Sequence, residues 1–91
     1  MTKLERKIQE EILHYIRTER RDIFAFKVIT ANERGIPDIV CCKDGQFITL
    51  EVKRPGEHLT PIQIEQTRRI NMAGGMACVV HSLEEAKEML K

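Results

Sequence analysis

A short segment in the middle of the chain limits its possible folds more than any other feature, because its pattern predicts a β-hairpin. Two apolar runs, residues 39–42 and 47–52, are separated by a few polar residues. The polar segment contains Asp44 and Gly45, and Asp-Gly is a strong signal for a two-residue hairpin turn. This turn fixes the register of the hairpin, so the partner of each strand residue follows from the sequence.

The predicted register places two acidic side chains opposite one another. Asp38, at the start of the first strand, faces Glu51 near the end of the second. Facing residues have Cβ atoms about 5 Å apart, and like charges at that distance destabilise the pair. A shared proton or a bound cation is the usual reason for keeping such a pair together.

Lys53 adds a basic group to this pair, because alternate side chains of a strand share a face and Lys53 follows Glu51 by two residues. An aspartate, a glutamate and a lysine in this arrangement suit metal-dependent attack on a phosphodiester. The hairpin alone leaves a second interpretation open, in which Lys53 pairs with Glu51 on a solvated surface and the pair contributes little.

Length and composition are typical of a small globular protein. The 91 residues are 42% apolar and 32% charged, which predicts one folded domain over residues 1–91. No apolar run approaches the ~20 residues that span a bilayer, and no apolar signal-peptide core follows the N-terminus. We expect the three cysteines to be reduced core residues of a cytoplasmic, intracellular protein. The net charge of +1 gives no overall attraction to nucleic acid, so any such contact depends on local charge.

The remaining periodicities predict the element order αβββαβα. A helix is expected over residues 2–21, a strand over 23–30 and a loop over 31–37. After the hairpin, we expect a helix from Thr60 to the glycines at 74–75, a strand over 76–81 and a helix from Ser82. The core positions expected from the first and last helices are Leu4, Ile8, Ile12, Tyr15, Ile16, Leu83, Ala86, Met89 and Leu90.

The two faces of the predicted hairpin differ in character. One is wholly apolar and should pack on helices; it carries Ile39, Cys41, Ile48, Leu50 and Val52. The other is apolar near the turn and ionic at the far end; it carries Asp38, Val40, Cys42, Phe47, Thr49, Glu51 and Lys53. A face graded in this way is typical of a cleft at one end of a sheet.

Four sequence elements occur in a specific order along the chain. They are Glu5 on the first helix, G-I-P-D at residues 35–38, E-V-K at residues 51–53, and Gln63 at the opening of the next helix. Together they resemble the VRR-NUC (virus-type replication-repair nuclease) family of the PD-(D/E)xK nuclease superfamily. The resemblance covers residues 4–81 and implies an α/β fold, an αβββαβα restriction-endonuclease-like core with a central mixed sheet flanked by helices.

The resemblance also implies an activity. Stand-alone members of the family are similar in build to archaeal-type Holliday-junction resolvases, which implies a homodimeric, Mg²⁺- or Mn²⁺-dependent endonuclease for branched DNA. Asp38 and Glu51 are assigned as direct metal ligands, because Mg²⁺ prefers oxygen ligands. The family pattern adds the Val52 carbonyl as a third ligand, with Glu5 reaching the ion directly or through a water.

The remaining motif residues have expected roles beside the metal. Lys53 would orient the attacking water or stabilise the charge that develops at phosphorus. Gln63 would hold the water or a phosphate oxygen, and its alternative role is that of the third residue of a capping box. Both roles of Gln63 are compatible.

Basic residues near the expected cleft are candidates for DNA contacts. These candidates are Arg34, Arg54, Lys27, Arg68 and Arg69, and for any one of them a solvated surface position is the alternative. Two other functions stay open at this point. One is a non-catalytic nucleic-acid-binding or assembly module with a nuclease fold, and the other is a nuclease acting on ordinary duplex DNA.

Overall fold

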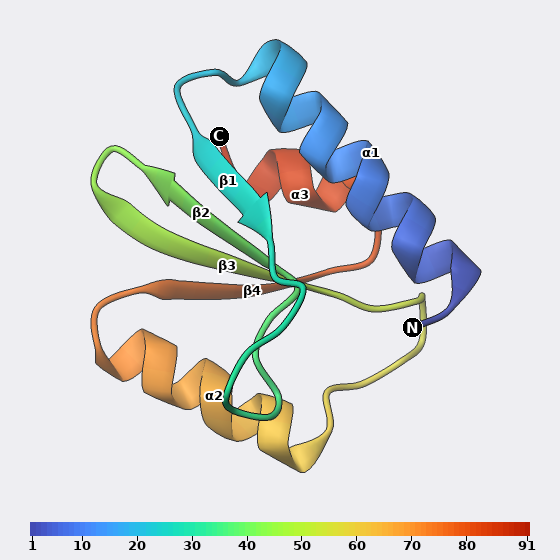
Figure 1. The fold of residues 1–91 in the computed structure, drawn as a ribbon, viewed down its shortest axis with the longest axis vertical. Coiled ribbons are helices and arrows are strands. Elements are labelled where there is room, and N and C mark those ends of the chain that lie inside the picture. The colour runs from blue at the N-terminus through green and yellow to red at the C-terminus, as the bar shows by residue number, and fades with distance from the viewer.

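A computed structural model describes all 91 residues and shows a four-stranded sheet with helices on both faces (Figure 1). None of its helices combines the length and the apolar character that a membrane span requires. The elements in chain order are α1 (Lys3–Glu19), β1 (Phe24–Lys27), β2 (Ile39–Lys43), β3 (Gln46–Val52), α2 (Pro61–Met72), β4 (Met76–Val80) and α3 (Leu83–Met89). The predicted αβββαβα order is therefore confirmed.

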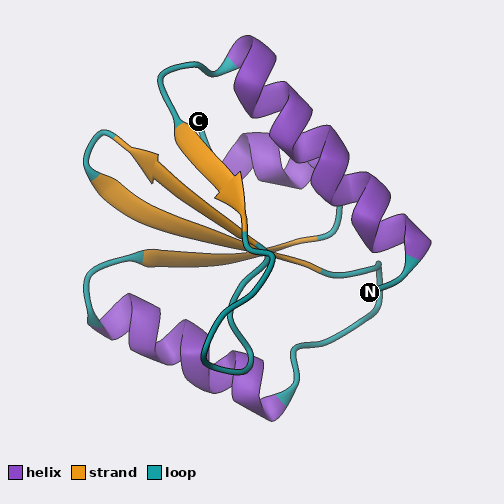
Figure 2. Cartoon of the chain, in the orientation of Figure 1, coloured by secondary structure: helices purple, strands orange, loops and turns teal.

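The sheet is mixed, in the order β1-β2-β3-β4. The first three strands form an antiparallel meander, whereas β4 runs parallel to β3. A parallel pair needs a crossover connection, and α2 provides it on one face of the sheet (Figure 2). The helices α1 and α3 lie together on the opposite face (Figure 1).

The β2–β3 hairpin has the predicted turn and register. Asp44 and Gly45 both have positive φ, 52° and 78°, as a type I′ turn requires. The observed pairs include Ile39 opposite Leu50. One further step along the same register places Asp38 opposite Glu51, as the sequence predicts.

The hydrophobic core lies between the sheet and the layer formed by α1 and α3. The apolar hairpin face is buried in it as predicted, and its five members are at most 2% exposed. The core cluster consists of Ile8, Ile12, Leu13, Ile16, Ile23, Ile39, Cys41, Ile48, Leu50, Val52, Cys78, Val80, Ala86 and Leu90. The opposite face of the sheet is covered by α2 alone, which packs on β4.

Strand β1 is shorter than predicted, ending at Lys27 instead of residue 30. Its partner β2 begins only at Ile39, after Pro37, which has no N–H to donate to a neighbouring strand. The last bond of this ladder is donated by the Val28 amide to the carbonyl of Asp38. Ile23 precedes the strand and is buried in the core.

Three expected core positions are wrong. Cys42 is exposed, because α2 covers only the β4 side of that sheet face; the other two cysteines are buried, and all three are unbonded. Met89 is 44% exposed, because the short α3 turns only Ala86 and the capping Leu90 fully inward. Leu4 is also exposed, since the first turn of α1 precedes the first core residue, Ile8.

Candidate active site

The first functional side chain, Asp38, is held in place by the backbone of β3. One of its carboxylate oxygens, Oδ2, accepts a hydrogen bond from the Val52 amide at 2.8 Å. Its own carbonyl accepts the bond from Val28. Asp38 is therefore fixed from both neighbouring strands, and its carboxylate points toward the last residues of β3.

Glu51 faces this carboxylate from β3 and is 7% exposed. Burial, followed by the nearby Asp38 charge and a hydrogen bond between the two carboxyl groups, raises the pKa of Glu51 from 4.5 to about 8. The positive charge of Lys53 acts in the opposite direction and is too weak to restore the ordinary pKa. Without a further positive charge, the pair holds a proton at neutral pH.

Lys53 directly follows β3 and is 8% exposed, which is unusual for a lysine. The backbone explains its position, because its amide donates to the Val80 carbonyl and so continues the β3–β4 pairing by one residue. None of the ion pairs in the structure involves Lys53. A buried ammonium without a paired carboxylate is available to an anionic group that enters the site.

The capping role expected for Gln63 is confirmed, whereas its contact with a water or phosphate oxygen stays a prediction. Its side-chain Oε1 accepts a hydrogen bond from the Thr60 backbone N–H, and its backbone N–H donates to the Thr60 hydroxyl. These two bonds complete the capping box of α2. Its Nε2 donates to Oε1 of Glu51 at 3.4 Å. The cap therefore fixes the side chain in the orientation that brings its amide nitrogen to the buried glutamate.

Glu5 is held at the start of α1 by a second capping box. Its Oε1 accepts from the amide and the hydroxyl of Thr2, at 2.9 and 2.8 Å. The backbone hydrogen bond from Thr2 lowers the pKa of Glu5, and the charges of Lys53 and Arg54 act in the same direction. Glu5 is thus ionised and close to the lysine, with one oxygen already occupied by the cap.

These side chains line one cavity of about 420 Å³ at the end of the sheet. It is lined by Met1, Thr2, Glu5, Asp38, Glu51, Val52, Lys53, Arg54, Glu57 and Gln63. Its walls come from the start of α1, the residue before β2, the end of β3 with the loop that follows it, and the start of α2. The cavity thus brings together Val52 and the five candidate catalytic residues, which are Glu5, Asp38, Glu51, Lys53 and Gln63.

The donor set fits a hard divalent cation with few protein ligands. No group of three or more His, Cys, Asp or Glu side chains is arranged to hold a metal ion. The pair Asp38 and Glu51 offers carboxylate oxygens whose mutual repulsion a cation would relieve. Mg²⁺ commonly uses one or two carboxylates and keeps several waters, so this smaller set is compatible with it.

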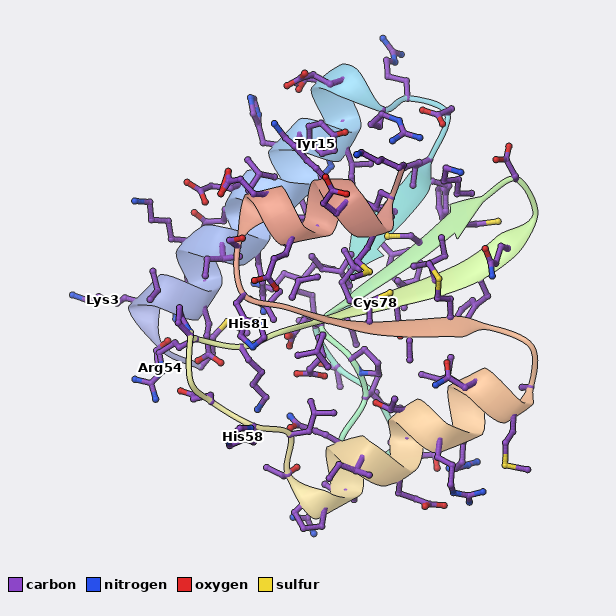
Figure 3. The ribbon with its side chains drawn as sticks, turned by 180° about the vertical axis from the view of Figure 1, so that it is seen from behind. Lys3, Tyr15, Arg54, His58, Cys78 and His81 are labelled. Carbon is purple, nitrogen blue, oxygen red and sulfur yellow. The ribbon has the colours of Figure 1, made fainter.

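The candidate DNA-binding residues are more widely spread over the structure than the candidate catalytic residues. Arg54 lines the cavity, forms an ion pair with Glu57 and lies next to the N-terminal end of α1 (Figure 3). Arg34 and Lys27 lie outside the cavity. On α2, Arg68 pairs with Glu65, and Arg69 pairs with Glu33 at 3.1 Å, so both are partly neutralised by neighbours.

Sequence reasoning missed two residues that shape the cavity. Thr2 was given no role in the site, yet it orients Glu5 within it. Glu57 was given no role either, yet it lines the cavity and pairs with Arg54. The three-residue spacing of Arg54 and Glu57 around a Pro-Gly turn was the available signal.

Comparison with known proteins places these features in context. The fold matches that of a solved "VRR_NUC domain" with a TM-score of 0.78, over 97% of this chain and 95% of that one, at 21% sequence identity. No family model matches the sequence. A protein of Acyrthosiphon pisum secondary endosymbiont phage 1, named "Putative nuclease p44", is 32% identical over 77 residues, which is 81% of this chain and 83% of the phage protein.

The fold and these relatives define the class of protein, which is a nuclease. The chain belongs to the VRR-NUC family.

Proposed function

We propose that this protein is a metal-dependent endodeoxyribonuclease that hydrolyses phosphodiester bonds in branched DNA such as Holliday junctions. The observation that carries the proposal is the facing pair of half-buried Asp38 and buried Glu51, with buried Lys53 beside it, all in one cavity. We further propose that residues 1–91 act as one nuclease domain inside the cell, as part of a homodimer with two such sites.

The proposed metal site uses few protein atoms. Asp38, Glu51 and the Val52 carbonyl would hold Mg²⁺ or Mn²⁺, with Glu5 reaching the ion directly or through a water by its Oε2, since Oε1 is engaged by Thr2. A divalent ion bound there would polarise the phosphate and lower the pKa of a bound water.

Lys53 would stabilise negative charge at the phosphate. Its ammonium is buried and belongs to no ion pair, so it can donate to a phosphate oxygen or orient the attacking water. Gln63 would hold the Glu51 carboxylate in place from the other side, since its Nε2 donates to Glu51 while its Oε1 is fixed by the helix cap.

DNA would approach along the surface around the cavity. Arg54 would contact phosphate directly from the cavity wall. Further contacts would come from Arg34 and Lys27, which belong to no ion pair in the structure, and from Arg68 on α2 once its acidic partner Glu65 exchanges for phosphate.

A substrate panel tests this function. Labelled four-way junction, flap and linear duplex are incubated with the protein, with and without Mg²⁺. We expect Mg²⁺-dependent cutting with preference for the branched substrates. Equal cutting of linear duplex would contradict the branched specificity, and binding to all three without any cutting would support a non-catalytic module instead.

A further inference from the structure

All three phenylalanines of the chain lie outside the hydrophobic core. Phe24, Phe26 and Phe47 are 70%, 45% and 47% exposed. The rings of Phe24 and Phe26 pack edge to face, with centroids 6.1 Å apart. Aromatic residues are among the most favourable to bury, so placing every phenylalanine at the surface indicates a surface that becomes covered.

The three rings occupy one face of the sheet, on the side that α1 and α3 do not cover. The first row across the strands contains Phe24, Cys42 and Phe47. The second row contains Phe26, Val40 and Thr49, and neither row includes a charged residue. We call these two rows the aromatic face; the next row along the strands carries the Asp38–Glu51 pair.

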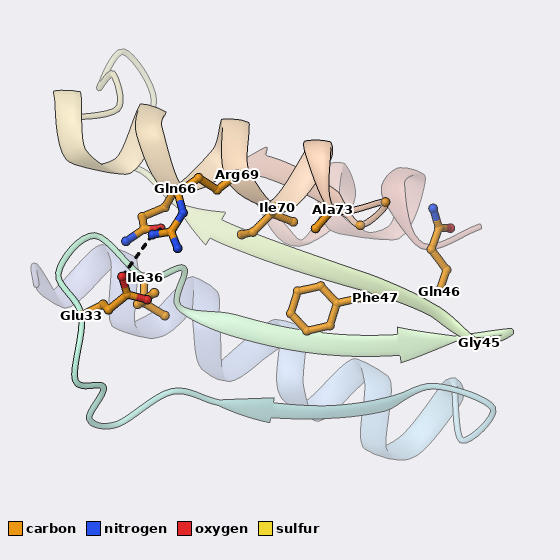
Figure 4. A pocket seen from close by; sticks show the side chains of 11 residues that line it. Glu33, Ile36, Gly45, Gln46, Phe47, Gln66, Arg69, Ile70 and Ala73 are labelled. Atoms are coloured by element: carbon orange, nitrogen blue, oxygen red, sulfur yellow. Dashed lines mark hydrogen bonds and ion pairs between the residues drawn. The ribbon is translucent and has the colours of Figure 1, made fainter.

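A groove lies at the far end of the first row. It has a volume of about 560 Å³ and runs between α2 and the hairpin, with Phe47, Ile70 and Ala73 among its walls (Figure 4). The groove and the Phe24 ring are therefore at opposite ends of the same row. Helix α2 packs on the β4 side of the face, and no helix covers the β1 side.

In a pair of copies, a two-fold axis parallel to the strands would place the Phe24 end of one row over the groove end of the other. Such an axis turns the face of one copy onto the face of another and reverses the strand order, so that β1 of one copy lies over the groove and α2 of the other. Two-fold interfaces are self-complementary, and here a protruding ring meets a hollow on both sides of the axis. We propose that a second copy of this chain docks on the aromatic face, with Phe24 of each copy in the groove of its partner.

Charge favours a second copy over a nucleic acid as the occupant. The aromatic face carries no cation to contact phosphate, and the arginine in the groove, Arg69, is paired with Glu33. Two uncharged faces can meet without burying an unpaired charge.

The area involved is also reasonable for two copies. At about 150–250 Å² per aromatic side chain, the exposed parts of the three rings amount to roughly 300 Å² per copy. A stable interface buries about 800 Å² per partner, so the groove walls and a polar rim would supply the remainder.

The dimer would also place the two candidate active sites relative to each other, and this step rests on the proposed nuclease function. An axis parallel to the strands preserves the strand direction, so the Asp38–Glu51 rows of both copies lie at the same end of the dimer. Two sites at one end can address two strands of a single branched substrate.

Sedimentation equilibrium at micromolar concentration, without metal or DNA, tests the proposal. We expect the parent protein to sediment as a dimer, and Phe24→Glu and Phe26→Glu to sediment as monomers with unchanged circular dichroism. Ala73→Arg, which fills the groove from an exposed position, should also give monomers. The matched control is Ile29→Glu, because Ile29 is 81% exposed in the loop after β1 and should not affect the mass.

A second measurement uses a native reporter. Cys42 is the exposed cysteine in the first row, so its alkylation rate should fall as the parent concentration rises and stay constant in Phe24→Glu.

A monomeric parent protein would overturn the proposal, and so would a dimer that persists in all three variants. It would also be overturned if the parent is monomeric and the two phenylalanine variants lose its binding to an oligonucleotide. The last result would assign the face to nucleic acid. A parent that dimerises through this face and cuts no DNA would contradict only the proposed nuclease function.

Discussion

At the scale of single residues, the site depends on two carboxylates whose mutual repulsion is unfavourable unless a proton or a cation neutralises it. Asp38 cannot move away from Glu51, because its Oδ2 is bonded to the Val52 amide. The energetic conflict is therefore built into the backbone register, and it appears as the raised pKa of Glu51.

This raised pKa predicts how stability depends on pH. The folded protein keeps the Glu51 proton up to about pH 8, whereas the unfolded chain loses it near 4.5. The stabilisation is thus fully present below pH 4.5 and is lost as the pH rises through 8. Each pKa unit corresponds to about 1.4 kcal/mol of unfolding free energy. Urea denaturation of the metal-free protein across this range measures the loss.

Glu51→Gln serves as the control, because an amide does not titrate. Its stability should be flatter with pH and should exceed that of the parent at the alkaline end. A parent and a variant with parallel pH profiles would show that Glu51 titrates normally.

Two substitutions can distinguish the helix-capping role of Gln63 from its role in the candidate active site. Gln63→Ala removes the capping bond from the Thr60 backbone N–H and also the contact to Glu51, whereas Thr60→Ala removes only the capping bond to the Thr60 hydroxyl. Each variant should lose about 1 kcal/mol of stability in thermal or urea unfolding. Only Gln63→Ala should also slow Mg²⁺-dependent cleavage; equal cleavage rates in the two variants would leave Gln63 with the capping role alone.

The sequence predicted these residues because their signals are local. The Asp-Gly turn fixes the facing of Asp38 and Glu51, and the Thr60–Gln63 spacing defines a cap. The exposure of Cys42 was not predictable in this way. It depends on how far α2 extends across the sheet, which no short pattern encodes.

Among the elements, the loop before β2 is held to α2 by two contacts. Gln66 Nε2 donates to the Arg34 carbonyl at 2.9 Å. Gly35 has a φ of 72°, and a Cβ on it would be 3.0 Å from both the Cγ1 and the carbonyl oxygen of Ile62. This close approach brings the start of β2, and with it Asp38, near the start of α2, where Gln63 lies.

Replacing Gly35 should therefore damage the site through the loop. Gly35→Ala pays about 1 kcal/mol or more for the left-handed backbone and must in addition push the loop away from Ile62. Gly74→Ala is the matched control, because Gly74 also has a positive φ, 96°, but open space around it. We expect both to lower the melting temperature and only Gly35→Ala to reduce cleavage. Equal activity of the two variants would show that the Gly35 contact does not position Asp38.

The elements themselves were largely predictable, and their limits less so. Periodicity and caps gave the αβββαβα order and the start of each helix. The end of β1 was missed because it depends on its partner strand, which starts after Pro37, and β-branched residues beyond Lys27 gave a false extension. The bare aromatic face was also visible only once strand order and helix placement were known.

For the whole molecule, DNA binding should depend on a few local cations, since the net charge is only +1. The logarithm of the binding constant should fall linearly with the logarithm of salt concentration, with a slope of about −0.9 per phosphate contact on duplex. Arg54→Ala should reduce that slope by roughly one contact, measured by fluorescence anisotropy with Ca²⁺ in place of Mg²⁺. A binding constant independent of salt would contradict phosphate contacts altogether.

The most direct measurement is the cleavage rate of a labelled four-way junction in Mg²⁺ by the parent and by Asp38→Asn. The substitution keeps the size of the side chain and its bond to the Val52 amide, but it removes one charge of the facing pair. Loss of a metal ligand removes several kcal/mol of transition-state stabilisation, so we expect the rate to fall by at least about 100-fold. A variant that folds normally and cuts as fast as the parent would contradict the assignment of Asp38 and Glu51 as the metal-dependent catalytic centre.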